Sequence, residues 1–187
     1  SRISASETIE ATVMFVDVCG FTTISEQAPP EQVVGMLNTY FDTMVQEIIS
    51  HEGYVDKFIG DAVLAVFRGE HHLDRGIEAA LAIRQAIGKL PEAEGTDHYR
   101  PMVSIGVESG EMVSGNIGSK SLKRLDYTVI GDTVNMAARL QDKAGPNQVL
   151  ISEPCYQKVK ESFKCNLLGE VSFKNKAASV KVYEVLE

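Results

Sequence analysis

Apolar residues follow two different periods along the chain, and together these periods predict alternating strands and helices. Helical spacing between residues 33 and 49, just after Pro29-Pro30, predicts an amphipathic helix. A second helix is expected at about residues 74–90, followed by a polar loop at residues 91–100. Short β-branched apolar runs predict strands, at residues 11–18, 54–59, 62–67 and 102–107. This order predicts an α/β (α+β) fold with a ferredoxin-like βαββαβ core.

The second half of the chain predicts a C-terminal αβ extension of this core. A strand at residues 111–117 is expected to continue the strand at 102–107 after a turn at Ser109-Gly110. The other expected elements are strands near residues 125–130, 149–152, 167–173 and 180–186, a helix between Gly131 and Gly145, and a short helix after Pro154. We expect a single domain over residues 1–187. Because the sequence begins with Ser1, we also expect a fragment whose missing part carries an anchor or a sensor.

Composition and charge exclude several classes of partner. The 18 Lys and Arg residues against 26 Asp and Glu leave a net charge of −8, and 44% of the residues are hydrophobic. The longest basic run is the dipeptide Lys123-Arg124, which argues against nucleic-acid binding and direct membrane contact. Cys19, Cys155 and Cys165 show no metal or redox spacing, which indicates reduced thiols. We therefore expect a soluble, cytoplasmic domain.

Two aspartates stand where predicted strands end. Asp17 closes the strand at residues 11–18, and Asp61 lies in the Gly60-Asp61 turn between two others. If these strands are neighbours, both carboxylates project from one edge of the sheet. Mg²⁺ is commonly held by one or two carboxylates together with substrate phosphates and waters. The alternative is that each is a turn aspartate that accepts hydrogen bonds from nearby backbone amides.

Three further features carry candidate chemistry. Cys19, Gly20, Phe21 and Thr22 join a strand to a helical turn, where free amides can hold a phosphate. The strand period places Lys57 on the same face as Ile59 and Asp61. Asn135 and Arg139, four residues apart, share one helix face and suit a sugar and a phosphoryl group. Taken singly, each has a commoner structural explanation: a glycine in a loop, a lysine on an edge strand, and an exposed polar stripe on a helix.

Three motifs in this order resemble the catalytic domain of the class III nucleotidyl cyclases, which include bacterial and animal adenylate cyclases. The motifs are Phe-Val-Asp-Val-Cys-Gly-Phe-Thr at residues 15–22, Lys-Phe-Ile-Gly-Asp at 57–61, and Asp-Tyr-Thr-Val-Ile-Gly-Asp-Thr-Val-Asn-Met-Ala-Ala-Arg-Leu at 126–140. The likeness extends over residues 10–185. It implies the cyclase fold and the conversion of ATP to cyclic AMP and pyrophosphate.

The resemblance also implies a role for each candidate residue. Asp17 and Asp61, with the Val18 carbonyl, would bind two Mg²⁺ or Mn²⁺ ions. The amides of Cys19, Gly20, Phe21 and Thr22 would hold the β- and γ-phosphates, and Arg124 and Lys174 would add further triphosphate contacts. Lys57 and Thr128 would recognise adenine, Asn135 would orient the ribose, and Arg139 would stabilise charge on the α-phosphate. The Lys-Gly pair common in the family is absent after Phe173, where Lys174 is followed by Asn175.

The family pattern further implies a head-to-tail homodimer with two shared sites. In each site the metal-binding aspartates come from one chain, and the base-reading residues and the helix with Asn135 and Arg139 come from the other. A guanylate cyclase is the nearest alternative, and Lys57 argues against it because guanylate cyclases place an acidic residue there. A catalytically silent nucleotide-binding partner is the second alternative. Loss of Asp17, Asp61, Asn135 or Arg139 would have favoured it, and all four are present.

Overall fold

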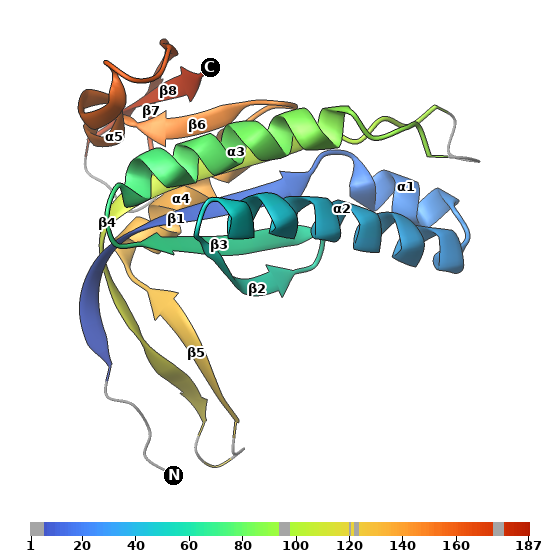
Figure 1. The fold of residues 1–187 in the computed structure, drawn as a ribbon, viewed down its shortest axis with the longest axis horizontal. Helices are drawn as coiled ribbons and strands as arrows, with labels where there is room; N and C mark the ends of the chain where they lie inside the picture. The colour runs from blue at the N-terminus through green and yellow to red at the C-terminus, as the bar shows by residue number, and fades with distance from the viewer. Residues whose placement is uncertain (1–5, 94–97, 120, 122–123, 174–177) are drawn as a thin grey trace.

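The fold is taken from a computed structural model that describes residues 6–93, 98–119, 121, 124–173 and 178–187. In chain order its elements are β1 (Glu7–Val18), α1 (Phe21–Gln27), α2 (Pro30–Ser50), β2 (Tyr54–Ile59), β3 (Ala62–Arg68), α3 (His72–Gly88), β4 (Val103–Ser119), β5 (Arg124–Ile130), α4 (Asp132–Lys143), β6 (Val149–Ser152), α5 (Glu153–Val159), β7 (Cys165–Val171) and β8 (Val180–Val185) (Figure 1).

One mixed sheet organises these elements. Its strand order is β2-β3-β1-β4-β6-β8-β7, and β5 pairs with β4 off this path. The β2-β3-β1-β4 part is antiparallel and is connected through α1, α2 and α3, which confirms the predicted ferredoxin-like βαββαβ core. The strand β6 adds parallel to β4, and the β7-β8 hairpin completes the C-terminal extension.

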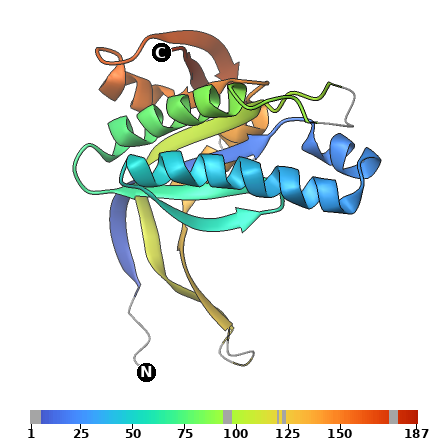
Figure 2. The same ribbon diagram turned by 45° about the vertical axis from the view of Figure 1, so that its right-hand side comes forward.

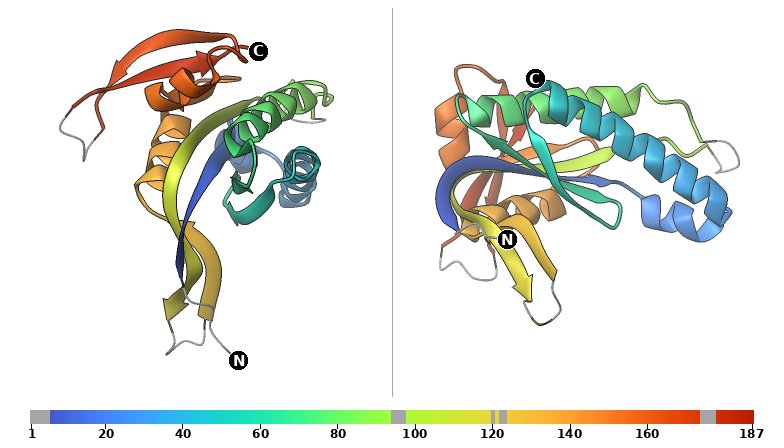
Figure 3. Two further views of the ribbon diagram at one scale, coloured as in Figure 1. Left: turned by 60° about the vertical axis from the view of Figure 1, so that its left-hand side comes forward. Right: turned by 60° about the horizontal axis from the view of Figure 1, so that its bottom comes forward.

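Helices cover both faces of the sheet. Figure 3 (left) shows α2 and α3 on one side and α4 on the other. Alternate residues of β1 pack on opposite faces of the sheet. Met14 and Val16 are buried in the core beneath α2 and α3, whereas Val13 is buried with Ala137 of α4. Asp17 has the same parity as Val13, so it belongs to the face that α4 covers.

The expected turn at Ser109-Gly110 is wrong, because β4 runs without a break through these residues. They pair with Thr12 and Ala11 of β1 in continuous register. The reason for a glycine here is packing: a Cβ on Gly110 would lie 2.7 Å from Oγ1 of Thr133 in α4. Gly110 therefore lets a helix approach the strand and does not reverse the chain.

Two predicted boundaries also move. The helix α5 begins at Glu153 and contains Pro154, because proline is tolerated in the first turn of a helix, where its missing N–H has no intrahelical partner. The strand β7 occupies Cys165–Val171, two residues N-terminal to the expected strand. The loop expected at residues 91–100 forms no helix or strand in its described part. Separately, none of the helices in the described segments is long and apolar enough to span a membrane.

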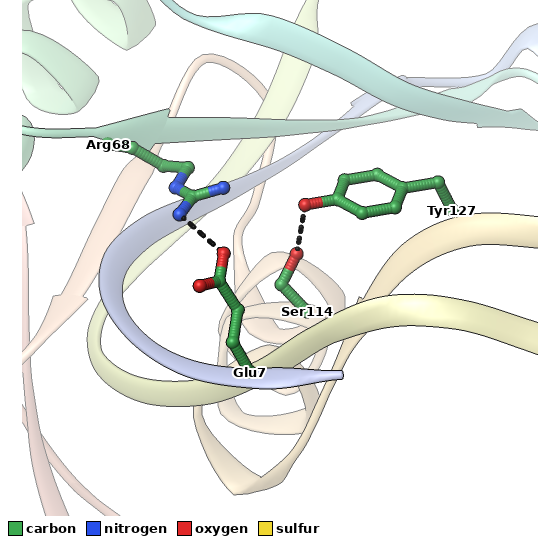
Figure 4. A network of polar contacts seen from close by, with 4 residues as sticks. All are labelled: Glu7, Arg68, Ser114 and Tyr127. Carbon is green, nitrogen blue, oxygen red and sulfur yellow. Dashed lines mark hydrogen bonds and ion pairs between the residues drawn. The ribbon is translucent and has the colours of Figure 1, made fainter. Parts of the chain in front are cut away.

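The paired ends of β4 and β5 extend away from the rest of the molecule as an arm (Figures 1 and 2). Two polar contacts lie near the base of this arm (Figure 4). Arg68 at the end of β3 donates to Glu7 of β1 at 3.1 Å, and Ser114 of β4 donates to the Tyr127 hydroxyl of β5 at 2.9 Å. The second contact joins β4 to β5 at the residue before Thr128.

Candidate active site

The two aspartates meet at one end of the sheet. Asp17 pairs with Ala62 across β1 and β3, and Asp61 immediately precedes Ala62 in the turn after Gly60, whose φ of +60° favours glycine. Burial, together with the negative charge of Asp61, raises the pKa of Asp17 to about 7. Oδ1 of Asp17 is buried and has no hydrogen-bond partner within the described residues. A buried carboxylate oxygen without a partner, beside a second carboxylate, is the arrangement that a cation would satisfy.

The donor set, two adjacent carboxylates, fits a hard divalent ion that also takes ligands from outside the protein side chains. Across the described residues, no group of three or more His, Cys, Asp or Glu side chains could hold a metal ion. Asp17 and Asp61 would therefore hold a Mg²⁺ ion only together with ligands from outside these side chains, such as water.

The raised pKa of Asp17 predicts that Asp17→Asn stabilises the metal-free protein. An acid whose pKa is raised above its ordinary 3.8 loses stability as the pH rises from about 4 to 7, and the full cost is present above pH 7. Solvent screens part of this cost because Asp17 is only half buried, so we expect a Tm gain of about 2–4 °C at pH 8 in a chelator, equivalent to about 1 kcal/mol.

Thermal unfolding measures this gain. The matched control is Asp42→Asn, which changes an exposed aspartate of α2 that accepts a hydrogen bond only from Gln46 among the bonds described. The gain should vanish at pH 3, where Asp17 is protonated in both the folded and the unfolded states. A lower Tm for Asp17→Asn at pH 8 would contradict the prediction.

The turn after β1 is tightly built. Gly20 adopts a φ of +71° and is the N-cap of α1, whose first residue, Phe21, is buried and packs edge-on against Tyr40. The Cys19 amide donates to the Met102 carbonyl at 2.8 Å, so in this structure it is not available to a phosphate. This corrects the predicted phosphate cradle, which is reduced to the amides of Gly20, Phe21 and Thr22.

Tyr99 supports this turn, and sequence reasoning missed it. Its hydroxyl donates to the Cys19 carbonyl at 2.7 Å from the loop between α3 and β4. The contact joins residues 80 positions apart, and the sequence predicted only a polar loop there. Both backbone polar groups of Cys19 are thus engaged by the segment that leads into β4, which limits the movement of the turn.

Lys57 and Thr128 come together around a third residue, Asp56, that the sequence analysis did not single out. Thr128 Oγ1 donates to Asp56 Oδ2 at 2.6 Å, and Lys57 Nζ lies 3.6 Å from the same oxygen. The Asp56 side chain is 1% exposed, whereas that of Lys57 is 42% exposed. The pair predicted to read a base is therefore adjacent, with the Lys57 ammonium open to solvent and the buried carboxylate behind it.

Asn135 and Arg139 lie on α4, a different element from those that carry the other two sets. Asn135 is exposed, and Arg139 lines a cavity of about 330 Å³ with Asp142, Ser172 and Phe173. Lys174 follows Phe173 but lies outside the described residues, as does Lys123. Only the backbone of Arg124 is described, at the start of β5. The triphosphate roles of Arg124 and Lys174 therefore stay predictions.

The candidate residues thus form three groups within one chain: the aspartate pair, the Lys57–Thr128 pair, and the two α4 residues. Among the hydrogen bonds and ion pairs of the described residues, none joins Arg139 to either of the other groups.

The fold is an α+β domain with a pair of aspartates at a strand end and a glycine turn after the same strand. A buried carboxylate, that of Asp56, contacts both a lysine and a threonine. The model of the adenylate and guanylate cyclase catalytic domain matches residues 3–186. The chain belongs to this family of cyclase catalytic domains.

Individual relatives include both kinds of cyclase. Adenylate cyclase 1 of Rhizobium meliloti is 35% identical over 186 residues, which cover 95% of this chain and 27% of that protein. The crystal structure of the adenylyl cyclase CyaB from P. aeruginosa matches with a TM-score of 0.91 and 28% identity over 98% of this chain and 97% of that one. The catalytic core of a rhodopsin-guanylyl cyclase with converted specificity, in complex with ATPαS, matches with a TM-score of 0.88 and 27% identity over 98% of both chains.

Proposed function

We propose that the chain is the catalytic domain of an adenylate cyclase, which converts ATP to 3′,5′-cyclic AMP and pyrophosphate. The observation that carries this proposal is the meeting of Lys57 and Thr128 at Asp56. An ammonium group beside a hydroxyl suits adenine, because the ammonium donates to a ring nitrogen and the hydroxyl accepts from the exocyclic amine. Guanine presents the opposite pattern: its ring nitrogen carries a hydrogen, and its exocyclic group at the same position is a carbonyl oxygen.

The reaction requires the protein to position the reacting groups and to neutralise charge, more than to supply a covalent nucleophile. The ribose 3′-oxygen loses its proton and bonds to the α-phosphorus as the bond to pyrophosphate breaks. In this proposal Asn135 holds the ribose and the Arg139 guanidinium stabilises the charge on the α-phosphate. The amides of Gly20, Phe21 and Thr22 hold the outer phosphates.

Asp17 and Asp61, with the Val18 carbonyl, are proposed to hold two Mg²⁺ or Mn²⁺ ions. The support is the buried, unpartnered Oδ1 of Asp17 beside the Asp61 carboxylate. When bound, the ions would supply charge neutralisation at the attacking and leaving oxygens. The carboxylates would then both be ionised, since the cation offsets their repulsion.

We also propose that two copies of the chain form a head-to-tail homodimer with shared sites. Exposed apolar side chains next to the Lys57–Thr128 pair support this arrangement, because surface of this kind is commonly covered by a partner. These side chains are Phe58, Ile59, Tyr127 and Ile130.

The chain spans 27% of the length of its Rhizobium relative. A longer protein in which a regulatory domain is attached to this cyclase domain is therefore part of the proposal. So is a cytoplasmic location, where ATP is available.

Product analysis tests the function directly. The purified chain is incubated with ATP and, separately, with GTP, each in Mg²⁺ and in Mn²⁺, and the cyclic products are separated by chromatography. We expect cyclic AMP to form at least about tenfold faster than cyclic GTP, the factor that a single mispaired polar group brings. Faster cyclisation of GTP would make the chain a guanylate cyclase, and no product with either nucleotide would favour a silent nucleotide-binding partner.

A further inference from the structure

We infer that Asp56 is a positioning residue that sets purine specificity by fixing the direction of the Thr128 hydroxyl. This inference rests on the proposed function and extends it to a residue outside the base-reading pair. It starts from the hydrogen bond of 2.6 Å in which Thr128 donates to Asp56, and from the near-complete burial of the Asp56 side chain.

A β-bulge brings Asp56 to this place. Val55 pairs with Ala65 and Lys57 pairs with the next residue, Leu64, so Asp56 is an extra residue in β2 with no partner in β3. In a regular strand Asp56 and Lys57 would point to opposite faces, whereas a bulge redirects the inserted side chain. The result is a carboxylate that reaches both the Lys57 ammonium and the hydroxyl of Thr128 on another strand.

The hydroxyl of threonine has one hydrogen and two lone pairs. An ionised carboxylate only accepts, so the bond to Asp56 consumes the single hydrogen of Thr128. Thr128 is 5% exposed, and any group that binds against its hydroxyl therefore meets an acceptor. The exocyclic amine of adenine can donate to it, but the carbonyl oxygen at the same position of guanine would face it lone pair to lone pair.

The same carboxylate oxygen lies 3.6 Å from Lys57 Nζ. At this length the contact is an ion pair and not a hydrogen bond, so the ammonium hydrogens stay available to a ring nitrogen. One buried anion thus contacts both the donor and the acceptor. Without it, the hydroxyl could turn and donate, and the site would lose its preference at the purine 6-position.

The test measures the ratio of kcat/KM for ATP to kcat/KM for GTP. Asp56→Ala removes the acceptor, and we expect the ratio to fall about 10- to 100-fold, the cost of misplacing a buried hydrogen bond. Asp56→Asn removes the charge but keeps a carbonyl oxygen that can accept from Thr128, so its ratio should stay within about threefold of wild type. Asp42→Ala removes an exposed carboxylate of α2, so it is the control for loss of a surface carboxylate and should leave the ratio unchanged.

A double variant separates positioning from a general structural effect. In a Thr128→Val background the hydroxyl is gone, so Asp56→Ala should change the ratio by less than about threefold beyond Thr128→Val alone. If Asp56→Ala does not fold, as judged by thermal unfolding, Asp56→Val provides an apolar side chain that fills more of the space. Wild type should also reject inosine triphosphate, which carries oxygen at the 6-position, by at least about tenfold relative to ATP.

The outcomes distinguish this inference from the function on which it rests. If wild type cyclises ATP and the ratio is unchanged in Asp56→Ala, or falls equally in Asp56→Asn, the role of Asp56 is overturned while the adenylate cyclase stands. Additive effects in the double variant, or equal use of inosine triphosphate and ATP by wild type, overturn it as well. If wild type makes no cyclic nucleotide, it is the proposed function that fails.

Discussion

Mixing Asp17→Ala chains with Arg139→Ala chains is expected to restore cyclase activity that neither variant has alone. Each variant by itself should lose about a thousandfold or more of kcat, since one lacks a metal ligand and the other a charge-stabilising guanidinium. In an equal mixture about half of the dimers are mixed, and each of these has one complete site of two, so about a quarter of wild-type activity should return.

The matched control is a mixture of Asp17→Ala with Asp61→Ala. Both substitutions affect the half of the site that one chain contributes, so every site in the mixed dimer lacks one aspartate and no activity should return. The variants are denatured and refolded together, or co-expressed, and cyclic AMP is measured at a fixed total chain concentration. Absence of recovery in the first mixture would contradict the shared-site homodimer and favour a site built within one chain.

Lys57→Glu is expected to lower kcat/KM for ATP by about 100-fold or more without a matching gain for GTP. The new carboxylate would lie next to the buried Asp56 carboxylate, which is 3.6 Å from Lys57 Nζ in this structure, and it would accept where adenine needs a donor. GTP gains little because Thr128 still donates to Asp56 and still presents an acceptor to the guanine carbonyl.

Steady-state kinetics with both nucleotides measures this effect. Lys181→Glu makes the same change of charge on an exposed residue of β8 and should leave both kcat/KM values within about twofold of wild type. Unchanged ATP turnover in Lys57→Glu would remove Lys57 from base recognition. A full exchange of specificity to GTP would instead show that Lys57 alone reads the base, and that Thr128 does not contribute.

The order of the core elements was predictable because its signals are local. The helical period before Ile49 and the β-branched run around Phe15 depend only on residues a few positions apart, and both elements form as expected. Asp17 and Asp61 were also recognisable, since each stands at the end of an apolar run. Ser109-Gly110 misled the prediction because a glycine that makes room for Thr133 has the same sequence signature as a turn.

What the sequence by itself determined is the family, the ferredoxin-like core and the candidate residues, because strand and helix periods and short motifs are properties of neighbouring residues. The tertiary structure alone decided how these residues meet. It engages the Cys19 amide with Met102 and the Cys19 carbonyl with Tyr99, and it joins Thr128 to Asp56, 72 positions away, through a bulge that strict alternation does not predict. Such contacts arise from the packing of distant strands, so no local pattern records them.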